Sequence, residues 1–227
     1  MWSFIVPVFL FASVVSGETN CEMNVFDFCV TPKIFFGIPL SVEEYNAHCP
    51  EMKNYMKCMK EYQDTCDTDN IFFETQEIYD GTYSAYSELC EEGSPFYKAV
   101  TENLRCFNET FENSRCEDET ADFIEEFKVP IDEEMKDHGT YSLPIEIMCL
   151  KDILDVACYT NDITTNCGSE AGEASRQFIR RAHYIENVCS PDNAKYLSED
   201  LHHYIALKDS QRDYLVEALA ELASRST

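Results

Sequence analysis

Cysteine is the residue type best able to do chemistry in this chain of 227 residues, which contains twelve of them. They are Cys21, Cys29, Cys49, Cys58, Cys66, Cys90, Cys106, Cys116, Cys149, Cys158, Cys167 and Cys189. Structural zinc sites use close pairs such as Cys-x-x-Cys, whereas the nearest cysteines here are eight positions apart. The even number and the wide spacing predict a framework of five or six disulfides, with no zinc site and no free catalytic thiol.

The other residue types that support catalysis do not fall into a catalytic motif. The run from Gly168 to Gly172 has glycines four apart, but Glu170 stands at its centre, so it is not a nucleophile elbow. None of the histidines lies in a His-Glu-x-x-His metal motif. They are His48, His138, His183, His202 and His203. The sequence therefore predicts no enzyme, no cofactor and no metal site.

Acidic residues dominate the charge, which is −26 at pH 7 with a pI near 4.3. Between Glu61 and Leu150 there are 24 acidic and 5 basic residues. Such a surface repels phosphate backbones and anionic membranes, which excludes nucleic acid as a partner. It also differs from the basic surface typical of channel-blocking toxins.

The N-terminus has the pattern of a secretory leader. Residues 4–15 form an apolar run too short to span a bilayer, and Val15-Ser16-Gly17 supplies small residues for cleavage. We expect a signal peptide over residues 1–17, a mature chain that begins near Glu18, and secretion to the extracellular space. No later segment of the sequence is long and apolar enough to predict a membrane span. The sequon Asn108-Glu109-Thr110 predicts N-glycosylation at Asn108, on an exposed surface.

Helices are the elements expected to position the cysteines, because glycine and proline are scarce and apolar residues recur at helical spacing. Ser41 begins a short helix that Cys49-Pro50 should interrupt, and Gly93-Ser94-Pro95 has the order of stop, N-cap and first helical residue. The expected helices cover 41–48, 50–66, 71–91, 95–104, 107–127 with a break near Cys116, 145–159 and 170–188. The predicted fold is mainly α, a disulfide-stapled helical bundle with a C-terminal amphipathic helix.

Three regions follow from this pattern: the leader, a cysteine-rich domain over residues 18–189, and a cysteine-free helical tail over 190–227. The stretch 130–144 is acidic and rich in turn residues, which predicts a linker that subdivides the domain. The tail has heptad spacing at Leu201, Ile205, Lys208, Arg212, Leu215, Leu219 and Leu222. This row either packs on its own domain, binds a partner or mediates self-association through 197–222, or belongs to a frayed end.

One disulfide pairing is suggested by spacing alone. Cys21 and Cys29 are eight residues apart, as are Cys58 and Cys66, and eight residues advance a helix by about two turns. Two antiparallel helices would then be joined by Cys21–Cys66 and Cys29–Cys58. Twelve cysteines allow about ten thousand connectivities, so this hairpin is a hypothesis and the other pairings stay open.

Several short strings resemble a known family. They are Tyr55-Met56-Lys57-Cys58-Met59-Lys60-Glu61-Tyr62, Glu88-Leu89-Cys90, Leu104-Arg105-Cys106, Cys167-Gly168-Ser169-Glu170-Ala171 and Phe178-Ile179-Arg180-Arg181. With the cysteine rhythm from Cys21 to Cys189, they resemble secreted, many-cysteine helical proteins of unknown function from arachnids, related to nematode secreted domains. The resemblance implies an extracellular arthropod protein of a body fluid, a secretion or venom, and it supplies no active-site residues.

Three functional hypotheses are compatible with these features. The first is a non-enzymatic secreted protein that binds an extracellular partner, such as a venom component. The second is a carrier of a hydrophobic small molecule, since aromatic and methionine side chains on helices can line a cavity as well as fill a core. The third is a structural component that self-associates through its tail.

Overall fold

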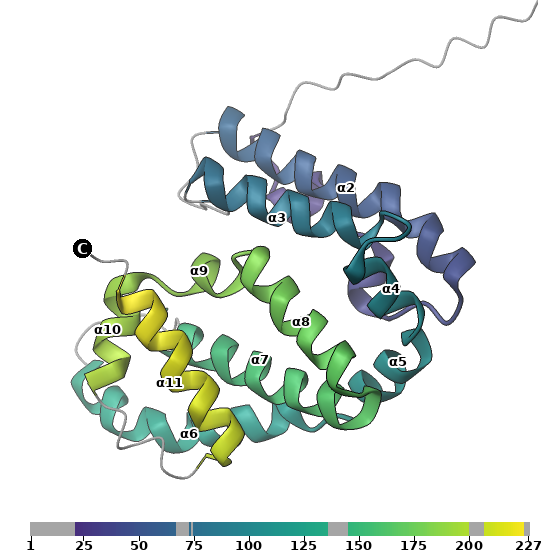
Figure 1. Cartoon of the computed structure of the whole chain (residues 1–227). Coiled ribbons are helices and arrows are strands. Elements are labelled where there is room, and N and C mark those ends of the chain that lie inside the picture. Colours follow the sequence, from purple (N-terminus) through teal and green to yellow (C-terminus); the bar gives the residue numbers. More distant parts are fainter. Residues whose placement is uncertain (1–20, 67–72, 74, 136–144, 200–206, 225–227) are drawn as a thin grey trace, which may run out of the picture.

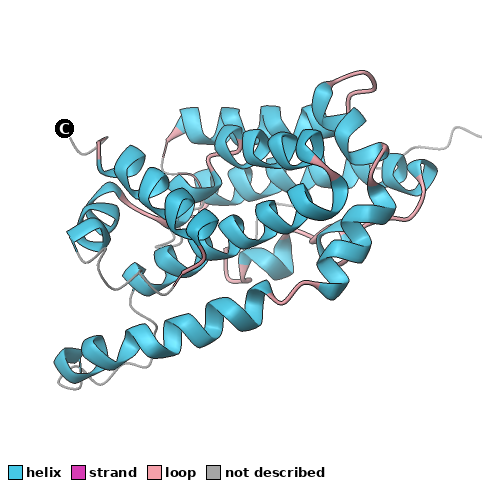
Figure 2. Ribbon diagram, turned by 60° about the horizontal axis from the view of Figure 1, so that its bottom comes forward, coloured by secondary structure: helices cyan, strands magenta, loops and turns pink. Residues whose placement is uncertain are grey.

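The computed structural model describes residues 21–66, 73, 75–135, 145–199 and 207–224, and these residues form helices connected by short loops (Figure 1). Within these ranges there is no strand (Figure 2). The fold is therefore the disulfide-stapled helical bundle that the sequence predicts. The leader expected over residues 1–17 lies outside the described residues.

The N-terminal half is built on a hairpin of two long helices, α2 and α3. Its elements are α1 (Val25–Phe28), the 3-10 helix η1 (Lys33–Phe36), α2 (Val42–Thr65), α3 (Gln76–Leu89) and α4 (Pro95–Thr101). The predicted caps are confirmed: the Ser41 hydroxyl accepts a hydrogen bond from the Glu44 backbone N–H at 3.1 Å. Ser94 likewise caps α4, and Gly93 adopts the left-handed conformation before it (φ 92°).

The predicted interruption at Cys49-Pro50 is wrong, because α2 continues through Pro50. Proline costs the helix one backbone hydrogen bond, but tertiary packing on both sides of it outweighs that loss. Tyr45 and Met52 are both buried in one cluster on either side of Pro50, and Cys49 is bonded to Cys90 of the α3 end. The apolar stripe predicted on this helix is confirmed as core. It comprises Met52, Tyr55, Met56, Met59 and Tyr62.

The C-terminal half is arranged around α7. Its elements are α5 (Leu104–Asn113), α6 (Cys116–Met135), α7 (Ile145–Cys167), α8 (Ser169–Arg181), α9 (Tyr184–Val188), α10 (Pro191–Glu199) and α11 (Asp209–Ala223). The predicted break near Cys116 and the predicted turn at Gly168 are both present. Every other helix of this half contacts α7, whose Leu150, Ile153 and Leu154 are almost completely buried.

The predicted linker over 130–144 is wrong at its start, because α6 extends through Pro130 to Met135. A helix that is already formed over three turns can carry a proline when the rest of the segment favours helix. Residues 136–144 lie outside the described part of the chain.

The tail packs on its own domain. Leu215, Leu219 and Leu222 of α11 are at most 4% exposed and share a core cluster with Leu197 of α10 and Leu150 of α7. The predicted row is divided between two helices, and Leu201 and Ile205 lie outside the described residues. The described leucines that were expected to mediate self-association through 197–222 are therefore buried in the chain's own core and do not form an exposed apolar row.

Six disulfides join all twelve cysteines. They are Cys21–Cys66, Cys29–Cys58, Cys49–Cys90, Cys106–Cys167, Cys116–Cys158 and Cys149–Cys189. The pairing hypothesised for the first hairpin is confirmed. The hypothesis assumed that each cysteine pair lies on a long helix, and this holds only for the second pair. Cys58 and Cys66 belong to α2 and its cap, whereas Cys21 and Cys29 flank the short helix α1, which covers only Val25–Phe28.

The same disulfide connectivity occurs twice. In each half the first cysteine pairs with the fifth, the second with the fourth and the third with the sixth, and no bridge crosses between residues 21–90 and 106–189. Within the long helix of each half, the third and fourth cysteines are nine residues apart. A Ser-Pro helix start follows the sixth cysteine in both, at Ser94 and Ser190. The molecule thus contains one six-cysteine architecture in two versions.

Candidate ligand site between the two halves

In the described part of the chain, every cysteine that the sequence singles out for chemistry is bonded to another cysteine. Cys116, Cys158 and Asp162 lie close enough to resemble a metal cluster, but both sulfurs are bonded to each other. A disulfide sulfur is no longer the thiolate that binds a metal. The Asp162 carboxylate instead accepts a hydrogen bond from the Ser114 hydroxyl at 2.8 Å.

The histidines also have structural surroundings. His48 is paired with Glu51 at 2.9 Å, one turn along α2. His183 has a left-handed backbone (φ 50°) between α8 and α9, and its Nδ1 lies 3.2 Å from Glu186. His138, His202 and His203 lie outside the described residues.

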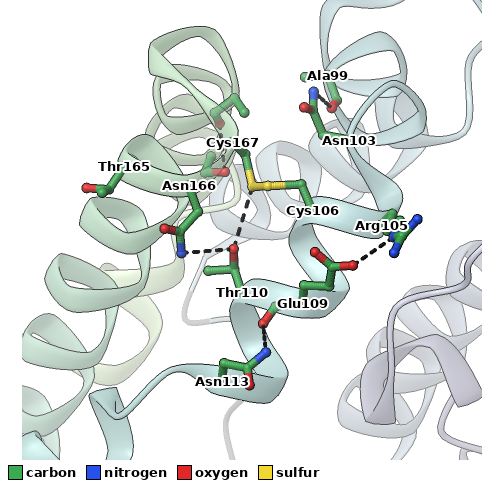
Figure 3. Close-up of a disulfide and its surroundings, with 12 residues drawn as sticks. Ala99, Asn103, Arg105, Cys106, Glu109, Thr110, Asn113, Thr165, Asn166 and Cys167 are labelled. Carbon is green, nitrogen blue, oxygen red and sulfur yellow. Dashed lines mark hydrogen bonds and ion pairs between the residues drawn. A yellow bond between two sulfur atoms is a disulfide. The ribbon is translucent and has the colours of Figure 1, made fainter.

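The sequon differs from its expected surroundings. Asn108 lies within α5 and is half-buried, and the Thr110 side chain is only 3% exposed. The Thr110 hydroxyl accepts a hydrogen bond from the Asn166 amide at 3.3 Å and lies 3.6 Å from the Cys167 sulfur (Figure 3). Asn108 is therefore half-buried and not on the exposed surface expected for it, because the sequon is packed against α7. Glycosylation at Asn108 stays a prediction.

An apolar cavity of about 380 Å³, about half open to solvent, lies where the two halves meet. The wall has aromatic and aliphatic side chains from α3, α4, α5, α7, α8 and α9, and one from the segment after η1. They include Ile38, Tyr86, Leu89, Phe96, Val100, Phe107, Phe111, Val156, Tyr159, Ile163, Phe178, Ile179 and Tyr184. The volume falls at the lower end of the range found for small-molecule sites.

Phe178 of α8 is the central ring of this wall. It packs edge-on against Tyr86 of α3 at 5.2 Å and against Phe96 of α4 at 5.9 Å between ring centroids. Edge-to-face contacts of this kind hold aromatic rings in defined orientations. Phe111 and Tyr159 form a second ring pair at 5.2 Å. Phe111 is 41% exposed and Tyr184 is 43% exposed, so the wall opens to solvent near these side chains.

Two hydroxyls of the wall are hydrogen-bonded within their own helices. The Thr160 hydroxyl donates to the Val156 carbonyl at 2.7 Å, and the Ser175 hydroxyl donates to the Ala171 carbonyl at 2.9 Å. Burial raises the pKa of Tyr86 to about 12. The lining contains no ionised side chain, and its other polar side chains are the phenols of Tyr86, Tyr159 and Tyr184.

Contacts between the halves hold the cavity wall in place. The Arg181 guanidinium forms a two-point ion pair with Glu88 and lies 5.1 Å from the centroid of the Phe96 ring. The buried Thr82 hydroxyl donates to the Ala182 carbonyl at 2.7 Å. Figure 1 shows the result, with α2 and α3 above α8 and α7, and with α4 and α5 at the end where the halves join.

A disulfide joins two of the helices that line the cavity, α5 and α7. Cys106–Cys167 joins α5 to the end of α7, and the close-up shows Thr110 pointing to the Cys167 sulfur (Figure 3). The cavity residue Phe107 directly follows Cys106, and the cavity residue Ile163 lies one turn before Cys167. The two side chains belong to one buried cluster. The bridge therefore fixes the separation of two helices that line the cavity.

The sequence did not reveal this site. Its lining residues come from segments spread over residues 38–184, and each segment taken alone looks like an ordinary apolar helix face. The one available signal is the recurrence of the cysteine spacing in the two halves, which would have predicted an interface between them.

Comparison with known proteins finds no match to a family model, a curated protein or a solved structure. Among the described residues, no helix combines the length and the apolarity that crossing a membrane requires.

Proposed function

We propose that this chain is a secreted, non-enzymatic carrier that holds one small, uncharged, apolar molecule in the cavity between its two halves. The observation that supports the proposal is the cavity itself, with its volume of about 380 Å³ and its wall of aromatic and aliphatic side chains. Apolar ligands bind by removing their surface from water, and the rings of the wall, such as Phe178, supply apolar surface for that contact.

The disulfides and the leader support the location. Six bridges persist only in an oxidising compartment, and the sequence has a secretory leader ahead of all twelve cysteines. A rigid, bridged shell suits a carrier in extracellular fluid, because the ligand meets a site that is already formed. The strong negative charge keeps such a carrier soluble and away from anionic surfaces.

The proposal is tested with N-phenyl-1-naphthylamine, an uncharged apolar dye whose fluorescence rises in apolar surroundings. We expect saturable binding with one dye per chain. Ser175→Leu places a larger side chain in the cavity wall and should weaken binding at least tenfold. Ser84→Leu is the matched control, because Ser84 is exposed on α3 and lies outside the cavity. Binding that is absent in the parent, or equal in both variants, contradicts the proposal.

A further inference from the structure

The chain exposes its large apolar side chains unevenly. Of the twelve that are exposed among the described residues, seven lie between Met23 and Val42. The most exposed are Val30 at 85%, Phe36 at 82% and Leu40 at 66%. Single exposed apolar residues are common on soluble proteins, but a concentration of them in one segment indicates an interaction surface.

Five of these seven side chains lie in residues 28–42, a stretch that carries no negative charge. Residues 28–42 contain no Asp or Glu and a single cation, Lys33. This is the longest acid-free run after the leader, in a chain whose net charge is −26. We call residues 28–42 the acid-free segment.

The acid-free segment is held firmly, although its apolar side chains are exposed. It begins beside the Cys29–Cys58 bridge, and Pro32 and Pro39 are buried. The Phe35 ring packs against Tyr55 at 5.6 Å and Tyr86 at 6.0 Å between centroids. Val30, Phe36 and Leu40 are therefore presented by an anchored backbone, which reduces the entropy lost when they bind.

Charge decides between the candidate occupants of this surface. A second copy of the chain carries the same −26 charge, and an anionic membrane is also negative, so both are repelled at long range. A lipid surface without net charge is not repelled, and it accepts apolar side chains into its interfacial region.

We propose that the acid-free segment docks the protein onto zwitterionic lipid surfaces, with Val30, Phe36 and Leu40 inserted among the lipids. The segment also contributes Ile38 to the cavity wall, between the exposed Phe36 and Leu40. Docking there brings the cavity close to the lipid from which an apolar ligand is taken or to which it is delivered. The inference extends the proposed carrier role, and its test does not depend on ligand binding.

The test uses a tryptophan reporter. The only tryptophan of the chain is Trp2, within the predicted leader, so Phe36→Trp gives the secreted chain a single tryptophan, whose emission can be excited selectively. With phosphatidylcholine vesicles we expect a blue shift of its emission and co-flotation of the protein. Leu40→Ser should lower vesicle partitioning about tenfold, because a buried leucine side chain contributes roughly that factor. Val216→Ser, at an exposed position of α11, should leave it unchanged.

Three results overturn the inference: no vesicle binding, stronger binding to phosphatidylglycerol than to phosphatidylcholine, or equal loss in both serine variants. A blue shift without vesicles, together with a doubled mass in light scattering, assigns the segment to a dimer interface and also overturns it. The dye titration separates the two proposals, because Leu40→Ser leaves the cavity wall intact and should bind the dye normally.

Discussion

Ser175→Leu should stabilise the folded protein while it weakens ligand binding at least tenfold. Ser175 lines the cavity, and its hydroxyl is bonded only to the Ala171 carbonyl one turn earlier in α8. Leucine places three additional carbons in the cavity, and burying each contributes about 0.8 kcal/mol. The lost hydroxyl bond offsets about 0.5–1 kcal/mol, and ordering the leucine rotamer costs about as much. We expect a net gain of about 1 kcal/mol in the free energy of unfolding.

Thermal and urea unfolding of the oxidised protein measure this gain, which corresponds to a rise in Tm of about 2–4 °C. Ser84→Leu makes the same substitution at an exposed position of α3 and should change Tm little. If the wall were closely packed, leucine would overfill it and cost about 1–3 kcal/mol. The sign of the change is therefore decisive, and a Ser175→Leu protein clearly less stable than the Ser84→Leu protein would refute the cavity.

Three further changes test the packing around the site. Replacing Cys106 and Cys167 by alanine removes a bridge whose loop is shortened to about 20 residues by the nested Cys116–Cys158 bridge, which should lower the free energy of unfolding by about 3 kcal/mol in urea titrations; an unchanged midpoint would contradict the bridge. Thr82→Val leaves the buried Ala182 carbonyl without its hydroxyl donor and should cost about 1–3 kcal/mol, whereas Thr82→Ser should retain most of the stability. Burial raises the pKa of Asp152, so its ionisation opposes folding and stability is lost as pH rises through that pKa. Asp152→Asn should therefore be more stable than the parent at neutral pH, with the gain absent below the ordinary aspartate pKa of about 3.9; a gain that is independent of pH would show that the charge is not the cause.

Helix class and most helix starts could be predicted from local chemistry. Ser41 and Ser94 cap helices as their sequence surroundings predict, because capping involves only neighbouring residues. Pro50 shows where local reasoning fails. Its penalty is local, but the burial of Tyr45 and Met52 that outweighs it depends on helices far away in the sequence.

The packing of the tail and the existence of the cavity could not be predicted from the sequence, and the physical reason is the same for both. Heptad spacing at Leu215, Leu219 and Leu222 describes an apolar face, and an apolar face is equally compatible with a partner helix or with the chain's own core. The cavity is the complementary case, since Phe178 and Tyr86 have the pattern of ordinary core residues. Whether such faces meet closely or leave a space between them is a property of the assembled bundle.

The disulfide pairing could be predicted in part from the sequence. The hairpin spacing in residues 21–66 led to two correct pairs. The remaining four follow once the chain is divided after Cys90, because the second half repeats the connectivity of the first. The repeat is visible in the sequence at Cys49–Cys58 and Cys149–Cys158, although the loops around it differ in length.

Native mass spectrometry of the protein purified from its natural source tests the carrier function most directly. We predict a mass increment that corresponds to one small apolar molecule per chain, that transfers to organic solvent on extraction, and that is absent from Ser175→Leu. A bare polypeptide mass for the parent, together with the same result after exposure to excess apolar dye, would contradict the proposed function.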